Sequence, residues 1–197
     1  VLAHSGRMVW NRALMIVREV NEALNFAWRN KQLVHRDIKP DNIILTESGS
    51  VKLADLGLAR RAGDFMDKQS GEIMGTPQYI SPEQLLHTTV DTRSDLYSLG
   101  ATFYHAVTGR FPYLGETPAD TVQKHLQEAL VPPRNVAADI PEPISRIIEI
   151  MMAKRPEHRY HDAAELAVDL ERVQNGQMPQ HPLAPDAQAP WLIPEVV

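Results

Sequence analysis

Three polar side chains in one short stretch, and a fourth further on, are of the types that handle protons, anions and metal ions. They are Asp37, Lys39 and Asn42, followed by Asp55. A carboxylate can accept a proton from a hydroxyl, an ammonium can stabilise an anion, and amide and carboxylate oxygens can bind magnesium. Pro40 excludes a helix interior here, so a tight loop must bring the first three together. A polar turn without chemistry is the alternative interpretation.

The stretch from His35 to Asn42 reads His-Arg-Asp-Ile-Lys-Pro-Asp-Asn. It resembles the H-R-D-x-K-x-x-N catalytic loop of eukaryotic-type serine/threonine protein kinases. The resemblance implies that Asp37 accepts or orients the proton of the attacking hydroxyl and that Lys39 stabilises the transferring phosphoryl group. It implies a structural role for His35. Five matching residue types in a fixed order argue against a chance match.

The tripeptide Asp55-Leu56-Gly57 resembles the D-F-G motif of the same family, with leucine in place of phenylalanine. An Asp-x-Gly tripeptide alone is more often a turn, but this one directly follows a predicted strand. The resemblance implies that Asp55 and Asn42 are the metal ligands and that Leu56 fills the hydrophobic slot of the usual phenylalanine. The implied cofactors are ATP and Mg²⁺ or Mn²⁺, with cofactor contacts from Lys39, Asn42, Ile44 and Asp55.

Residues 75–83 resemble the end of a kinase activation segment, and Ser81-Pro82-Glu83 stands where the family has A-P-E. The resemblance places the Thr76 hydroxyl near Asp37 and Lys39. This threonine, together with Lys39, is typical of serine/threonine kinases rather than tyrosine kinases. The expected partners are therefore ATP and proteins that offer serine or threonine hydroxyls.

Two distant residues complete the resemblance. Asp95 begins a D-x-x-x-x-G pattern that ends at Gly100, and Arg159 lies near the end of the similar region. The resemblance implies that Asp95 braces the catalytic loop by accepting backbone hydrogen bonds, and that Arg159 pairs with Glu83. Taken alone, the first would be an ordinary acid in a helical first turn and the second a solvated surface arginine.

A regulatory role is predicted for Arg36, Ser70 and Thr76. Kinases with an arginine before the catalytic aspartate commonly use it to hold a phosphate on the activation segment, and a phosphate can order such a loop. Ser70 is the only hydroxyl-bearing residue between Asp55 and Gly75, which makes it the candidate acceptor. Thr76 is a poorer acceptor, because its hydroxyl is expected beside Asp37. The alternative is that Arg36 pairs with an acidic residue such as Asp64 or Asp67.

Helical periodicity surrounds these motifs. It predicts helices over residues 8–30 and 93–108, the second closed by Gly109, and further helices opened by Pro118 and Pro141. A last helix carries Ala163, Leu166, Leu170 and Val173. Two short apolar runs, 43–45 and 51–54, are separated by turn residues and predict a hairpin. Residues 55–83 read as a long functional loop. The fold class is mainly α (α+β), a protein-kinase-like large lobe with short β-hairpins at the catalytic loop.

Composition narrows the classes of function. The chain of 197 residues has 43% hydrophobic and 23% charged residues, which is an ordinary globular balance. A net charge of -5 argues against nucleic-acid binding, and no run of residues is apolar enough for a membrane segment. The absence of cysteine excludes disulfides and is compatible with a cytoplasmic setting. The full-length protein could still carry a membrane anchor.

The sequence contains no G-x-G-x-x-G loop and no strand lysine ahead of the catalytic loop. We therefore expect residues 1–176 to be a kinase C-terminal lobe without its small lobe, and the proline-rich residues 177–197 to be a flexible tail. The pattern in residues 75–79 and 93–102 favours a bacterial member of the family. One hypothesis is a fragment of a working kinase, inactive alone. The alternative is a truncated, non-catalytic binding module, which would have no need of the whole catalytic set.

Overall fold

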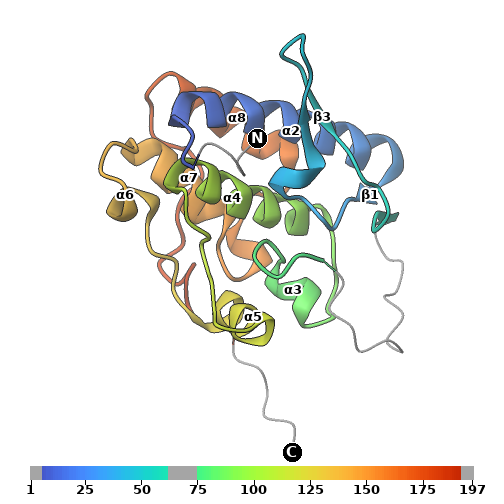
Figure 1. Ribbon diagram of the computed structural model, residues 1–197, viewed down its shortest axis with the longest axis vertical. Coiled ribbons are helices and arrows are strands. Elements are labelled where there is room, and N and C mark those ends of the chain that lie inside the picture. The colour runs from blue at the N-terminus through green and yellow to red at the C-terminus, as the bar shows by residue number, and fades with distance from the viewer. Residues whose placement is uncertain (1–5, 62–74, 192–197) are drawn as a thin grey trace, which may run out of the picture.

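The computed structural model describes residues 6–61 and 75–191, and helices dominate it (Figure 1). The helices are α2 (Trp10–Lys31), α3 (Pro82–Leu85), α4 (Thr92–Thr108), α5 (Pro118–Gln127), α6 (Pro133–Val136), α7 (Glu142–Met151) and α8 (Ala163–Gln174). Two single turns of 3₁₀-helix cover Pro40–Asn42 and Pro156–His158. The expected class, mostly helical with a few short strands, is confirmed.

Helix α4 is the centre of the core. It is buried on nearly all sides, because apolar and small residues cover its whole circumference. Asp91 caps its first turn and Gly109 ends it with a φ of 71°, as the glycine predicted. Gly100 allows α7 to approach closely, since a Cβ atom there would lie 2.8 Å from the Cβ of Met151. The packing of α4 therefore fixes the position of its first turn and of the segments that are bonded to that turn.

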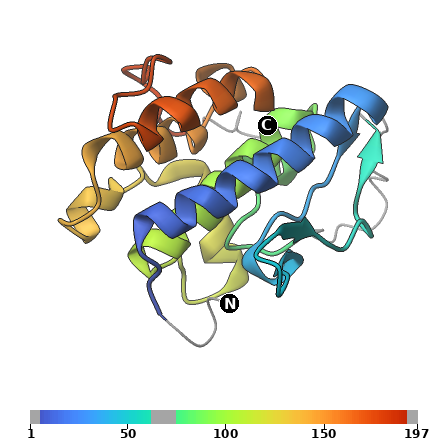
Figure 2. The same ribbon diagram turned by 90° about the horizontal axis from the view of Figure 1, so that it is seen from above.

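Helix α2 lies across the molecule, with α4 beneath it and α8 alongside (Figure 2). Its apolar stripe, which includes Leu14, Val17 and Leu24, is buried against both neighbours. The buried Asn21 amide donates to the Ala163 carbonyl at 2.7 Å, which pins α2 to the start of α8. The predicted helix over residues 8–30 is confirmed to within two residues at each end.

Two antiparallel pairs of strands lie at one side of the helices. β2 (Ile43–Leu45) pairs with β3 (Val51–Leu53), so Ile43 faces Leu53, and this is the predicted hairpin. β1 (Leu33–Val34) pairs with β4 (Arg60–Arg61), a short strand inside the stretch that was expected to be loop. Pairing across so many intervening residues leaves no local signature in the sequence.

The shorter helices begin where capping residues predict. Thr117 and Asp120 form a capping box at the start of α5, with Pro118 in its first turn, and Asp162 caps α8 through two backbone N–H groups. Pro141 is the N-cap of α7 rather than its first residue. In the described part of the chain, no helix combines the length and the apolar character needed to cross a membrane.

The prediction of a flexible tail is wrong for residues 177–191. The buried Asp169 carboxylate accepts the backbone N–H groups of Gln180 and His181 at 2.6 and 3.0 Å. Further along, Ala187 is buried and its carbonyl accepts the Lys154 N–H at 2.7 Å, and the Trp191 N–H donates to Leu126 at 2.9 Å. Prolines prevent regular structure but not packing, so this segment forms a strap that joins α8 to the end of α5.

Candidate active site

The catalytic-loop residues are held from below by the first turn of α4. The buried Asp95 carboxylate accepts the backbone N–H groups of His35 and Arg36, each at 2.8 Å. Burial raises the pKa of Asp95 to about 6, and the two N–H groups oppose that shift. Arg36 adopts a left-handed φ of 70°, a conformation that a non-glycine residue needs support to keep. The Asp95 contacts supply that support and turn the chain sharply before Asp37.

Asp37, Lys39 and Thr76 form one contacting group. Lys39 Nζ lies 2.7 Å from Asp37 Oδ2 and donates to Thr76 Oγ1 at 2.8 Å. The Thr76 hydroxyl lies 3.3 Å from Asp37 Oδ1. The side chains of Asp37 and Lys39 are 10% and 21% exposed, so the pair is shielded from bulk water but open at its tip. A proton acceptor and a fixed cation thus share one small site.

The β2–β3 hairpin brings the residue before Asp55 to Asn42. The Ala54 N–H donates to the Asn42 carbonyl at 2.8 Å, so Asp55 follows directly after the residue that is bonded to Asn42. The Asn42 amide nitrogen donates to the backbone carbonyl of Asp37 at 2.7 Å. Its Oδ1 forms no hydrogen bond with any described residue. His35 Nε2 donates to the Ala54 carbonyl at 3.1 Å and thereby ties the catalytic loop to the end of β3.

The donor set suits a hard divalent cation. Asp55 is exposed, has a left-handed φ of 62°, and accepts the Gly57 N–H at 3.0 Å through Oδ1. A Cβ atom at position 57 would lie 2.9 Å from that oxygen, so only glycine leaves the carboxylate in this place. An amide oxygen and a carboxylate are ligands that magnesium accepts when phosphate oxygens and water complete its shell. The residues present therefore fit the expected metal.

Two apolar side chains beside these polar groups point outward. Ile44, on β2, is 49% exposed, and Leu56 is 59% exposed. Leu56 was expected to fill a hydrophobic slot, but no described residue buries it. Exposed large aliphatic side chains close in sequence to polar site residues are positions at which an apolar group of a ligand or partner can pack.

Glu83 and Arg159 form a buried ion pair, as the resemblance implied. Arg159 NH1 and NH2 lie 2.7 and 2.9 Å from the two carboxylate oxygens, a bidentate geometry, and the Ser94 hydroxyl donates at 2.6 Å. Burial by itself would raise the pKa of Glu83, but the Arg159 charge and these hydrogen bonds outweigh it and hold the pKa below its ordinary value. The pair joins the end of the activation segment to the α7–α8 connection.

Sequence reasoning missed several residues that position the site. The Gln84 amide donates to the Arg36 carbonyl at 3.0 Å and so ties α3 to the catalytic loop. The Tyr79 hydroxyl bonds His105 Nδ1 at 2.7 Å. A glutamine beside the A-P-E-like tripeptide and a histidine on a helix rich in apolar and small residues were the available signals. Ser70 lies outside the described residues, and Arg36 is buried at the base of the loop.

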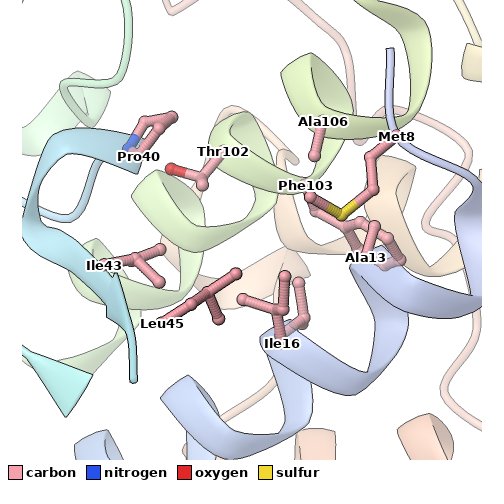
Figure 3. A pocket seen from close by; sticks show the side chains of 10 residues that line it. Met8, Ala13, Ile16, Pro40, Ile43, Leu45, Thr102, Phe103 and Ala106 are labelled. Atoms are coloured by element: carbon pink, nitrogen blue, oxygen red, sulfur yellow. The ribbon is translucent and has the colours of Figure 1, made fainter. Parts of the chain in front are cut away.

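A small apolar cavity lies behind the catalytic loop, between α2, α4 and β2 (Figure 3). The side chains that face it include Met8, Ile16, Ile43 and Leu45, and the cavity volume is about 40 Å³. Cofactor sites usually offer about 300–1,000 Å³ and a few polar groups. The cavity is therefore too small and too apolar for a nucleotide, and the open face above Asp37 and Asp55 is the candidate site.

Comparison with known proteins agrees with this geometry. Residues 1–169 match the family described as "Protein kinase domain". The chain is 39% identical over 179 residues to serine/threonine-protein kinase PknB of Mycolicibacterium smegmatis, and 38% to the Mycobacterium tuberculosis protein of that name. Each alignment covers 90% of this chain and 28% of the relative. A probable serine/threonine-protein kinase of Clostridium acetobutylicum is 36% identical over 175 residues, which is 89% of this chain and 26% of that protein.

The chain thus spans a little over a quarter of the length of these relatives. The matched region contains the catalytic loop, the Asp55 motif and the activation-segment end. Together with the contacts among Asp37, Lys39 and Thr76, it establishes the family: the chain belongs to the protein kinase domain family and is similar to its bacterial serine/threonine members.

Proposed function

We propose that this chain is the larger, C-terminal lobe of a serine/threonine protein kinase that transfers the γ-phosphoryl group of ATP to serine or threonine hydroxyls of proteins. The observation that carries the proposal is the contact of Asp37, Lys39 and Thr76, with Asn42 bonded to Asp37 and with Asp55 directly after the residue that is bonded to Asn42. Positioning and charge stabilisation are most of what phosphoryl transfer requires, and this cluster supplies both.

Each side chain has one task in this proposal. Asp37 accepts or orients the proton of the substrate hydroxyl, and Lys39 stabilises charge on the group in transfer. Asn42 Oδ1 and the Asp55 carboxylate hold Mg²⁺ or Mn²⁺ with the ATP phosphates. The metal, when bound, neutralises phosphate charge. Thr76 keeps Lys39 directed at Asp37, so the proton acceptor and the cation stay together during the reaction.

We propose that a small lobe completes the nucleotide site. The chain has no glycine-rich loop and no strand lysine, the groups that clamp ATP phosphates in complete kinases. Ile44 and Leu56 are exposed where an adenine base and the second lobe would rest. Ile44 then serves as an apolar floor for the base, and Leu56 packs against the added lobe.

The expected result is that the 197-residue chain alone shows negligible phosphoryl transfer. The chain extended by the sequence that its gene encodes upstream of Val1 should label serine and threonine in a generic protein substrate. The measurement is incorporation of labelled phosphate followed by phosphoamino-acid analysis, with Mg²⁺ present or chelated. Robust transfer by the chain alone would contradict the need for a small lobe. An upstream sequence without the glycine-rich loop would favour the non-catalytic binding module.

We also propose that phosphorylation of Ser70 activates the enzyme. Arg36 is fixed beside Asp37 by the Asp95 bonds, so a phosphate that engages Arg36 would be coupled directly to the catalytic loop. Ser70→Ala should then lower the activity of the extended enzyme, and mass spectrometry of active wild type should find phosphate on Ser70. Full activity of Ser70→Ala, with Ser70 unmodified in wild type, would favour the alternative, in which Arg36 pairs with an acidic residue and needs no phosphate.

A further inference from the structure

The end of the activation segment departs from the family pattern at a position that the proposed chemistry does not explain. Where the family has the alanine of A-P-E, this chain has Ser81, and Gln84 directly follows the tripeptide. Ser81 has no exposed surface and Gln84 is 3% exposed, so both polar side chains are removed from water. A buried polar group is costly unless it is hydrogen-bonded, so the partners of these two side chains indicate what they do.

The Gln84 side chain joins α3 to the catalytic loop. Its Nε2 donates to the backbone carbonyl of Arg36 at 3.0 Å. At the other end of the same amide, Oε1 accepts the Ser81 hydroxyl at 2.8 Å and lies 3.4 Å from the Ser81 backbone nitrogen. The amide therefore connects the N-cap of α3 to the residue that precedes Asp37.

The orientation of this amide follows from the chemistry of its partners. A backbone carbonyl only accepts hydrogen bonds, so the amide atom that faces Arg36 must be the nitrogen. The amide oxygen then faces Ser81, whose hydroxyl donates to it. Alanine at position 81 would remove this donor and leave the longer contact of the backbone nitrogen at 3.4 Å. The Ser81 hydroxyl therefore fixes the direction in which Gln84 donates.

Arg36 is a residue whose backbone conformation needs support. Its φ of 70° lies in the left-handed region, which a non-glycine residue keeps only when the surrounding structure holds it there. Its backbone N–H donates to Asp95 Oδ1 at 2.8 Å, and its carbonyl accepts the Gln84 amide. The backbone of Arg36 is thus held at both ends, by α4 through Asp95 and by α3 through Gln84.

The carbonyl that Gln84 holds belongs to the peptide group that leads into Asp37. A peptide group is planar, so the direction of the Arg36 carbonyl also fixes the direction of the Asp37 N–H. Rotation of this group would move the Asp37 backbone, and with it the carboxylate that lies 2.7 Å from Lys39 Nζ. A misplacement of about 1 Å can lower turnover on the order of 10²-fold. The bond from Gln84 therefore acts on the residue on which the proposed proton transfer depends.

We propose that Gln84 is a positioning residue for Asp37 and that the Ser81 hydroxyl directs its amide, so that the end of the activation segment holds the peptide group before the catalytic aspartate. The consequence for turnover rests on the proposed kinase function, whereas the contacts do not. Among the described residues, the Gln84 side chain bonds Ser81 and Arg36 and neither Asn42 nor Asp55. Its effect is therefore expected on turnover and not on the binding of ATP.

The first test uses the 197-residue chain and needs no activity. Gln84→Met keeps the length of the side chain but removes the donor, so the backbone amides of residues 35–39 should exchange with solvent about threefold to tenfold faster, the factor that one lost hydrogen bond allows. Asn21→Leu is the matched control, because it removes another buried amide donor, which bonds the Ala163 carbonyl at 2.7 Å between α2 and α8. Unchanged exchange in a folded Gln84→Met, or equal acceleration in Asn21→Leu, would overturn the proposal.

The second test uses the extended, two-lobe enzyme and a fixed serine-containing peptide. Gln84→Met should lower kcat about tenfold, because Asp37 is misplaced, while the peptide KM and the ATP KM stay within about twofold. Asn21→Leu loses a comparable bond far from the catalytic loop and should keep kcat within about twofold of wild type. A wild-type kcat in Gln84→Met, or an equal loss in Asn21→Leu, would show that Gln84 does not position Asp37.

Ser81→Ala tests the hydroxyl separately and restores the alanine of the family pattern. We expect it to lower kcat about threefold, because the amide of Gln84 loses the donor that directs it. In the Gln84→Met background the same substitution should have no further effect on kcat, because Ser81 acts only through that amide. Losses that multiply in the double variant would refute the coupling between the two side chains.

The two tests separate failure of this inference from failure of the proposed function. An extended wild-type enzyme that transfers no phosphate would refute the kinase proposal, and the exchange comparison would still decide whether Gln84 holds the catalytic loop. Thermal unfolding of each protein is measured first. Should Gln84→Met fail to fold, Ser81→Ala removes a single hydroxyl and takes its place in the exchange test, where unchanged exchange of residues 35–39 would overturn the proposal.

Discussion

Replacing Asp37 by asparagine in the extended enzyme is expected to lower kcat on the order of 10²- to 10⁴-fold, the range that a positioned general acid–base group contributes. Asparagine has nearly the same shape, so the bond from the Asn42 amide to the backbone carbonyl of residue 37 can persist. What is lost is the negative charge that lies 2.7 Å from Lys39 Nζ and the ability to accept a proton. The measurement is steady-state transfer to a peptide, with thermal unfolding as the check of folding.

Asp41→Asn is the matched control for this substitution. Asp41 lies in the same loop, is exposed, and makes none of the contacts that join Asp37, Lys39 and Thr76. The substitution removes an identical charge a few residues away, so it tests whether any loss of negative charge in the loop lowers turnover. We expect its kcat to stay within about threefold of wild type. Wild-type turnover in Asp37→Asn would refute the assignment of Asp37.

Replacing Arg159 by leucine is expected to lower the free energy of unfolding by about 3–5 kcal/mol, the usual cost of leaving one member of a buried ion pair without its partner. Both partners are almost completely inaccessible to solvent, so no water can replace the guanidinium at Glu83. The substitution also removes the donors that Arg159 gives to the carbonyls of Ala153 and Lys154, at 2.8 Å each. Urea unfolding of the 197-residue chain measures the effect.

Arg134→Leu is the matched control for this loss. Arg134 forms an ion pair with Glu142 at 2.9 Å, similar in length to the buried pair, but both side chains are about half exposed. Exposed pairs contribute at most about 1 kcal/mol, because water and salt screen them. Similar costs for the two substitutions would contradict the view that burial makes Arg159 important.

The pH dependence gives the Arg159 prediction a second readout. In wild type the pKa of Glu83 is held below its ordinary 4.5, so its contribution is complete above that pH and is lost as the pH falls through the folded-state pKa. In Arg159→Leu, burial without the arginine charge raises the pKa of Glu83. The folded variant then takes up a proton more readily than the unfolded chain and gains stability as the pH falls. The difference between the two proteins should therefore shrink from pH 7 towards 4.5.

Local chemistry along the chain determined a large part of this protein. The helices follow from apolar spacing and from capping residues such as Asp162 and Gly109, whose effects reach no further than a few neighbours. The β2–β3 hairpin follows from the turn around Gly49, which adopts a left-handed φ of 84°. The order of residue types from His35 to Asn42 carried the candidate chemistry, because a short loop keeps Asp37, Lys39 and Asn42 close in the chain, although the distant Asp95 is needed to hold that loop in its conformation.

Only the tertiary structure decided the contacts that join distant segments. The pairing of β4 with β1 and the packing of residues 177–191 depend on surfaces that other helices create, and the prolines of that segment suggested a loose tail instead. His125 and Lys154 look like ordinary solvated residues of a surface helix and a loop. In the folded chain both are completely buried, and Lys154 Nζ donates to the His125 carbonyl at 2.7 Å, since burial makes an unpaired polar group costly. Sequence pattern encodes which face of a helix is apolar, whereas the polar partner that this face meets is set by the packing of the whole lobe.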